Sequence, residues 1–273
     1  MTPPGRPKGE HRSAQREAAP VTPPSPRRAR LAYKDESFLD SDDARPLRIL
    51  AEYLQPLYAF QRERIRGTVV FFGSARLARD GPLGRYYDAA RELARLVTLW
   101  SGELSSEACH CVVCTGGGGG IMEAANRGAS EAGGKSIGLN IGLPQEQRPN
   151  AYITPGLGFE FHYFFMRKLW FAHLARALVV FPGGFGTLDE LTEILTLMQT
   201  GKIVRRIPVV LYGSAYWNEV IDFEALARHG TIDRADLALF RFVDDPPAAL
   251  ALLQQAMGPV DVAAPAIAHS RTP

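Results

Sequence analysis

The sequence lacks any apolar run of the roughly 18–20 residues that a membrane-spanning helix needs. It also lacks the apolar core of a secretory signal peptide, because its first residues are rich in proline and arginine. We therefore expect a cytoplasmic protein. With 273 residues, of which 46% are hydrophobic, the chain can bury a sizeable core in one large α/β domain or two small ones.

Cysteine is scarce, and its three copies are clustered at Cys109, Cys111 and Cys114. An odd count at such close spacing argues against a disulfide framework. A zinc site is also disfavoured, because structural zinc usually takes four ligands and the chain has no second cysteine cluster. The segment instead has the composition of a buried strand, where free cysteine acts as a small apolar side chain. The sequence therefore predicts no metal site.

Acidic groups are few in the first 30 residues, which carry seven basic and two acidic side chains. A basic tail is able to contact nucleic acid or a membrane surface. Its many prolines and few apolar residues favour a solvated, disordered segment instead. Because the whole chain has a net charge of only +2, the remainder is net negative and makes no electrostatic case for nucleic-acid binding.

Apolar runs alternate with helix-like segments along most of the chain. We expect strands at 68–72, 110–114, 136–141, 177–181 and 207–212, a candidate short strand at 152–153, and helices at 37–66, 84–100, 121–132, 161–174, 188–200, 215–229 and 246–256. This alternation predicts an α/β fold, a Rossmann-like doubly wound parallel sheet with helices on both faces. The main strands are apolar throughout, as expected when both faces are covered.

Three glycine turns directly follow strands, at 73–74, 115–120 and 182–187. Ligands of such sheets bind beyond the carboxyl ends of the strands, so we expect these turns to share one crevice. The last turn is the most informative, because it leads into a helix with Asp189 and Glu190 expected in its first turn. Backbone N–H groups at such a helix start suit a phosphate.

Two common glycine-rich nucleotide-binding motifs are missing. The dinucleotide fingerprint fails because the sixth position counted from Gly116 is Ile121. The P-loop fails because the segment around Lys135 has Ala129 where a glycine is needed, and it runs from helix into strand. Neither NAD nor a nucleoside triphosphate is favoured, and the sequence predicts no cofactor.

Four segments resemble the motifs of the Lonely Guy family, in order: Phe71–Arg76, Thr115–Asn126, Met166–Lys168 and Pro182–Glu190. The family comprises cytokinin riboside 5′-monophosphate phosphoribohydrolases and related nucleosidases, many of them once labelled lysine decarboxylase. The resemblance covers about residues 67–255, and the N-terminal extension resembles that of the longer bacterial members.

The sequence departs from the family pattern at two positions. Gly119 stands where proline is frequent, and Phe164 stands where plant-type members have methionine. The second departure bears on the shape of the purine pocket.

The resemblance implies an enzyme that hydrolyses the N-glycosidic bond of a nucleoside 5′-monophosphate, AMP or an N6-modified AMP, to free base and ribose 5-phosphate. It also implies a homodimer or a larger homo-oligomer. Glu190 is expected to be the catalytic carboxylate and Arg167 the essential arginine, which either holds Glu190 or contacts the substrate. The expected substrate-binding residues are Gly73, Ser74, Thr115, Gly116, Gly117, Gly118, Gly183, Gly184, Gly186 and Thr187.

The implied domain organisation is a disordered basic tail at 1–35, a helical extension at 36–66, a Rossmann-like nucleotide-binding catalytic domain at 67–257 and a flexible tail at 258–273. Several alternatives stay open. Thr187 and Glu190 also fit a capping box. The protein could bind or sense a nucleotide without catalysis, or use its basic tail as an adaptor. A pyridoxal-phosphate decarboxylase would need a Schiff-base lysine, and only Lys168 is expected near the crevice.

Overall fold

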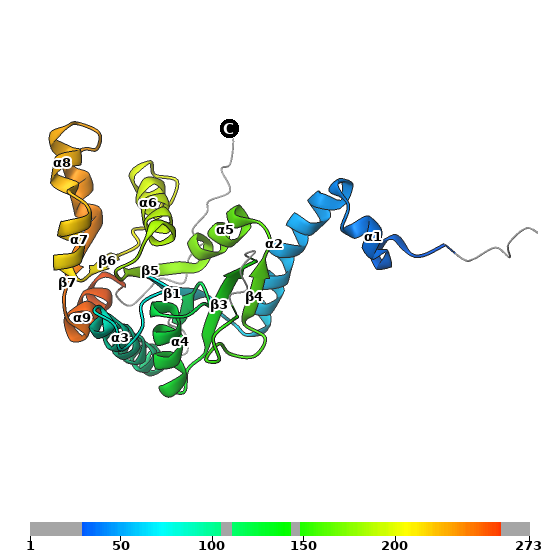
Figure 1. Cartoon of the computed structure of the whole chain (residues 1–273), viewed down its shortest axis with the longest axis horizontal. Coiled ribbons are helices and arrows are strands. Elements are labelled where there is room, and N and C mark those ends of the chain that lie inside the picture. Colours follow the sequence, from blue (N-terminus) through cyan, green and yellow to red (C-terminus); the bar gives the residue numbers. More distant parts are fainter. Residues whose placement is uncertain (1–28, 105–110, 143–147, 258–273) are drawn as a thin grey trace, which may run out of the picture. The chain divides into compact units, whose positions relative to one another are not determined.

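The computed structural model describes residues 29–104, 111–142 and 148–257 (Figure 1). The chain divides into two compact units, residues 1–44 and 45–273, which we describe separately. The described part of the first unit contains η1 (Ala32–Lys34), α1 (Glu36–Leu39) and η2 (Asp42–Ala44). Most of the two predicted tails and Cys109 lie outside the described residues.

The second unit alternates strands and helices. Its elements are α2 (Arg45–Arg62), β1 (Gly67–Phe72), α3 (Gly84–Glu103), β2 (Cys111–Thr115), α4 (Ile121–Glu131), β3 (Ser136–Ile141), β4 (Gly158–Phe161), α5 (Phe164–Leu174), β5 (Ala175–Val180), α6 (Phe185–Gln199), β6 (Val209–Tyr212), α7 (Ser214–Val220), α8 (Phe223–Arg228), η3 (Arg234–Leu239), β7 (Phe240–Val243) and α9 (Pro246–Met257).

The strands form one parallel sheet in the order β4-β3-β2-β1-β5-β6-β7, which confirms the predicted fold class. The chain adds strands on one side of β1 as far as β4 and then crosses back to β5 on the other side. The strand order thus reverses between β1 and β5. This switch point is where sheets of this kind bind their ligands, beyond the carboxyl ends of the strands.

Side chains of β1 point alternately into two apolar layers. Val69 and Phe71 pack with α3, α4 and α9, whereas Val70 and Phe72 pack with α2, α5, α6 and α7. Figure 1 shows α3, α4 and α9 on one side of the sheet and α5 and α6 on the other. Because helices cover both faces, all of β1 is buried, and its last four residues, Val69–Phe72, are apolar.

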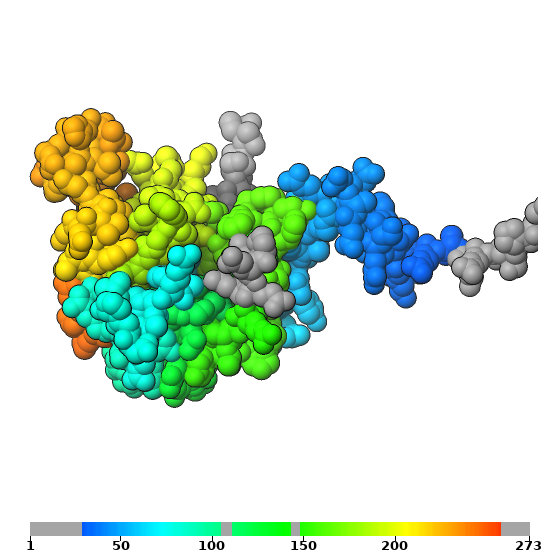
Figure 2. All heavy atoms as spheres, in the orientation of Figure 1, coloured from blue at the N-terminus to red at the C-terminus, as the bar shows by residue number. Residues whose placement is uncertain are grey.

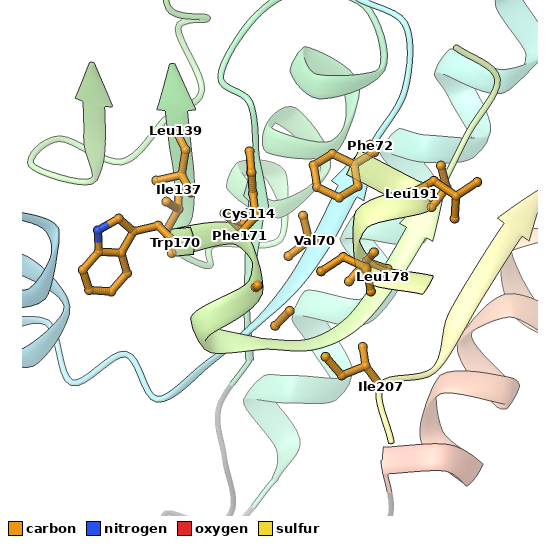
Figure 3. Packing of buried hydrophobic residues seen from close by; sticks show 14 of the residues in the cluster. Val70, Phe72, Cys114, Ile137, Leu139, Trp170, Phe171, Leu178, Leu191 and Ile207 are labelled. Atoms are coloured by element: carbon orange, nitrogen blue, oxygen red, sulfur yellow. The ribbon is translucent and has the colours of Figure 1, made fainter. Parts of the chain in front are cut away.

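The layer that contains α5 and α6 is drawn in Figure 3. Leu178 of β5 lies in it with no exposed surface. Trp217 of α7 is equally buried, and its indole N–H donates to the carbonyls of Val180 and Tyr212 at 3.2 and 3.1 Å. Helix α2 joins this layer through Tyr53, whose ring stacks on Trp170 with the centroids 5.5 Å apart. The α2 helix therefore packs against α5.

Several predicted boundaries were wrong. The candidate strand at 152–153 is a turn, and two short strands, β4 and β7, were missed. The predicted helix at 37–66 is broken between α1 and α2, and the one at 215–229 between α7 and α8. Helix α6 begins at Phe185, three residues before the predicted start. Among the described residues, no helix combines the length and the apolar content that crossing a membrane requires.

The core layer makes a testable prediction about stability. We expect Leu178→Ala to lower the free energy of unfolding by about 2–5 kcal/mol, because it opens a cavity in a fully buried layer. The matched control is Leu50→Ala on α2, where the side chain is 50% exposed, with an expected change within about 0.5 kcal/mol. Urea unfolding followed by circular dichroism measures both, and equal losses would contradict this account of the core.

Candidate functional site

A cavity of about 680 Å³ opens at the switch point, beyond the ends of β1 and β5. The three glycine turns that we expected to converge all contribute to its wall. In Figure 2 the cyan residues that follow β1 lie beside the yellow-green residues that follow β5. The predicted site residues that line the cavity are Gly73, Ser74, Gly116, Arg167, Gly183, Gly184, Gly186, Thr187 and Glu190.

Ser74 joins the three turns through its backbone. Its N–H donates to the carbonyl of Pro182 at 3.0 Å, and its carbonyl accepts from the N–H of Ile121 at 3.1 Å. The Pro182 bond prolongs the pairing of β1 with β5, and the Ile121 bond fixes the start of α4. Gly73 permits this approach, because a Cβ there would lie 2.6 Å from Cγ2 of Ile121.

The start of α6 differs from the predicted one. Gly184 is the N-cap, so the backbone is already helical at Phe185. As a glycine it supplies no side-chain hydrogen bond to the helix start. Thr187 therefore lies inside the first turn, where its N–H donates to the Gly184 carbonyl at 3.0 Å. The capping-box alternative was wrong, because Thr187 is not the N-cap.

The early start of α6 also moves its acidic residues. Asp189 and Glu190 lie in the second turn, and the first turn carries no acidic residue. The prediction that both belong to the first turn was wrong. The positive end of the helix dipole is therefore not neutralised by a carboxylate of its own first turn.

Arg167 and Glu190 form an ion pair in the cavity wall. One terminal nitrogen of Arg167 donates to Oε1 of Glu190 at 3.2 Å. Their side chains are only 14% and 5% exposed, respectively. The guanidinium carbon lies over the rings of Phe164 and Phe171, 5.2 and 5.6 Å from their centroids. These rings limit the positions open to Arg167, so its fork stays directed at α6.

Burial perturbs the pKa of both partners. It raises the pKa of Glu190 to about 7, although the charges of Arg167 and Lys168 act in the opposite direction. Burial also lowers the pKa of Arg167, again opposed by Glu190. A carboxyl group with a pKa near neutrality can exchange a proton at physiological pH, as acid–base chemistry requires.

Lys168, the next residue on α5, is not solvated. Its ammonium lies 2.8 Å from Asp189, 2.7 Å from Glu193 and 3.8 Å from Oε2 of Glu190. Only 16% of the side chain is exposed. Burial acts to lower the pKa of Lys168, but its hydrogen bonds to Asp189 and Glu193 outweigh it and leave the pKa raised. Asp189, which was expected in the first turn of the helix, thus lies in the second turn and pairs with Lys168.

Three predicted substrate-binding residues, Thr115, Gly117 and Gly118, do not line the cavity. The Thr115 hydroxyl is fully buried, donates to Asn126 at 2.7 Å and accepts from the Gly117 N–H at 2.9 Å. The Asn150 amide donates to the carbonyls of Gly117 and Gly118 at 3.1 and 3.0 Å. This polar network holds the turn after β2, and direct contact of its members with a ligand stays a prediction.

Other cavity residues were not identified from the sequence as site residues. Arg76, Met122, Phe171 and Tyr216 line the cavity, and the Tyr216 hydroxyl donates to the Gly183 carbonyl at 2.8 Å. A second cavity of about 500 Å³ shares Arg76 and Tyr216 and extends along residues 77–83. Arg76 closes the first-strand motif, and that signal could have drawn attention to it. The sequence offers no comparable signal for Tyr216.

The described cysteines do not form a metal centre. Cys111 and Cys114 are buried in β2, as predicted for an apolar strand, and burial raises the pKa of the Cys114 thiol. Within the described ranges, no group of three or more histidine, cysteine or acidic side chains is arranged to hold a metal ion.

The turn before α6 generates a prediction. We expect Gly183→Ala to lower the free energy of unfolding by about 1–3 kcal/mol, because a Cβ there would lie 2.1 Å from the Thr187 hydroxyl and 2.7 Å from its Cβ. Gly186→Ala is the matched control: it meets nothing within 4 Å, and alanine is favoured over glycine in a helix by about 1 kcal/mol. Denaturant unfolding measures both variants, and equal destabilisation would contradict the packing described here.

Comparison with known proteins adds to this geometry. A family model described as "possible lysine decarboxylase" matches residues 122–253. A cytokinin riboside 5′-monophosphate phosphoribohydrolase of Arabidopsis thaliana is 29% identical over 171 residues, which cover 60% of this chain and 70% of the relative. One from Oryza sativa subsp. japonica is 31% identical over 153 residues, 55% of this chain and 56% of the relative.

Solved structures share the fold. The molybdenum cofactor binding protein from the phototrophic bacterium Rippkaea orientalis superposes with a TM-score of 0.50 at 19% identity, and the match covers 71% of this chain and 99% of that one. At this identity the likeness shows the fold alone. The matching family model and the named relatives confirm the predicted resemblance to the Lonely Guy family.

Proposed function

We propose that the protein hydrolyses the N-glycosidic bond of a nucleoside 5′-monophosphate, AMP or an N6-modified AMP, to free base and ribose 5-phosphate. The observation that carries this proposal is the buried Arg167–Glu190 pair in the wall of the cavity that the glycine turns also line. The names of the relatives support the reaction class at the level of the family.

In the proposed complex the 5′-phosphate binds at the start of α6. The first N–H groups of a helix have no preceding turn to bond to, and the helix dipole favours an anion there. The N–H of Thr187 already bonds the Gly184 carbonyl, so the phosphate is expected at the N–H groups that precede it. Gly183, Gly184 and Gly186 carry no side chain that would keep a phosphate away. Arg76 lines the cavity beside the same turn and adds a cation.

The proposed chemistry uses Glu190 in its ionised form. Glycosidic cleavage passes through a transition state like an oxocarbenium ion, with positive charge on the sugar. A fixed carboxylate beside the sugar stabilises that charge and orients the attacking water. The 3.2 Å contact from Arg167 supports a role in holding this carboxylate, and its place in the cavity wall leaves it able to contact substrate as well.

A pyridoxal-phosphate decarboxylase is less well supported. A Schiff-base lysine must present an uncharged amine to the cofactor. Lys168 instead has a raised pKa and binds Asp189 and Glu193, and it is not among the residues that line the cavity. The remaining alternative is a protein that binds a nucleotide without cleaving it.

Base release from nucleotides tests the proposal. We expect free base and ribose 5-phosphate from AMP or N6-isopentenyl AMP, with GMP and CMP as comparison substrates, separated by chromatography. Glu190→Gln and Arg167→Ala should each lose activity by about a hundredfold or more. Glu103→Gln, an exposed change of the same kind at the end of α3, should keep it.

Two results would count against catalysis. Nucleotide binding by calorimetry without base release would favour the non-catalytic alternative. Base release that survives Glu190→Gln would remove this carboxylate from the mechanism.

The pKa of Glu190 sets the expected pH dependence. If the carboxylate form is active, kcat/KM rises as the pH increases through about 7, by about tenfold between pH 6 and pH 8. The substrate phosphate titrates near pH 6, about one unit lower. The midpoint of the pH–rate profile therefore distinguishes titration of Glu190 from titration of the phosphate. A rate that falls over the same range would indicate that Glu190 acts in its protonated form.

A further inference from the structure

Five charged side chains form one cluster between α5 and α6. Arg167 and Lys168 come from α5, and Asp189, Glu190 and Glu193 come from α6. Arg167 lies 3.2 Å from Oε1 of Glu190, and Lys168 lies 3.8 Å from Oε2. The two oxygens of one carboxylate therefore each face a different cation.

Lys168 also contacts the two remaining acids, Asp189 at 2.8 Å and Glu193 at 2.7 Å. These contacts hold its ammonium between the second and third turns of α6. Other groups of the cavity wall that carry a charge or a titratable proton are Arg76, after β1, and Tyr216, on α7.

We propose that Lys168 is a positioning residue of the site, which keeps the Glu190 carboxylate ionised and neutralises Asp189 and Glu193 beside it. The inference rests on the proposed function, because it gives Lys168 a role in the reaction assigned to Glu190. Lys168 does not line the cavity itself, so it acts through Glu190 and not on the substrate.

The sign of the effect follows from the charges. Burial favours the protonated form of Glu190, and the two cations oppose it. Without Lys168 one of these cations is lost, and the negative charges of Asp189 and Glu193 are left unneutralised near Glu190. Both changes disfavour the ionised form of Glu190, so both raise its pKa. Surface ion pairs have weak effects of this kind, but here the lysine is 16% and Glu190 only 5% exposed.

The test is a titration of Glu190 in the full chain. The protein is labelled with ¹³C at the glutamate carboxyl carbons and observed by NMR. The Glu190 resonance is the one that is missing from the spectrum of Glu190→Gln. We expect Lys168→Met to raise the pKa of Glu190 by about one unit, the lower end of what a neighbouring opposite charge produces. Lys168→Arg keeps a cation at this position, so the pKa of Glu190 should stay close to its value in the unaltered protein. Glu193→Gln should move the titration the other way, because it removes a negative neighbour.

The same variants are then assayed for base release across pH. A rise of about one unit from a pKa near 7 predicts about fivefold lower kcat/KM at pH 7 and near-complete recovery at pH 9. Lys202→Met is the matched control, since Lys202 is exposed in the loop after α6. A purely structural role for Lys168 predicts a loss that is equal at every pH.

An unchanged Glu190 titration in Lys168→Met would overturn the inference, whatever the activity. A shifted titration in a protein that releases no base would leave the electrostatic role intact and refute the proposed function instead. The two failures are therefore distinguishable.

Discussion

The two backbone hydrogen bonds of Ser74 are the constraint on which the site depends. They tie the end of the central strand to Pro182 and to Ile121, and so bring the turns after β1, β2 and β5 to one place. Because these bonds involve only backbone atoms, the register of the sheet fixes the positions of the turns. The cavity is therefore positioned by the most buried part of the fold, together with the polar network of Thr115, Asn126 and Asn150 that holds the turn after β2.

Burying the Arg167–Glu190 ion pair within this fold costs free energy. Removing Arg167 and Glu190 from water is unfavourable, and their attraction offsets it only where the geometry is good and further partners are present. Here α5 and α6 pack on the same face of the sheet and supply those partners: two aromatic rings for Arg167 and a second cation for Glu190. The helices are thus arranged to sustain a charge cluster that a looser interface would let water screen.

The errors of prediction have local physical causes. Strands β4 and β7 lie at the two edges of the sheet, and neither shows a continuous run of buried residues. Without such a run the apolar signal is too weak to mark a strand of four residues. Helix α6 was placed too late because Gly184 and Gly186 have low helix propensity, which packing on the sheet overrides. The same misplacement produced the false capping box at Thr187.

The sequence by itself determined the parallel α/β fold, since continuous apolar strands alternating with helices can be buried only between two helical layers. It also determined which turns meet, because all of them follow parallel strands. The tertiary structure alone decided what the charged groups contact. Arg167, Lys168 and Glu190 lie on two helices separated by a strand, and their distances depend on how those helices pack. The raised pKa of Glu190 likewise comes from burial, which is a property of the packed layers and of no single segment.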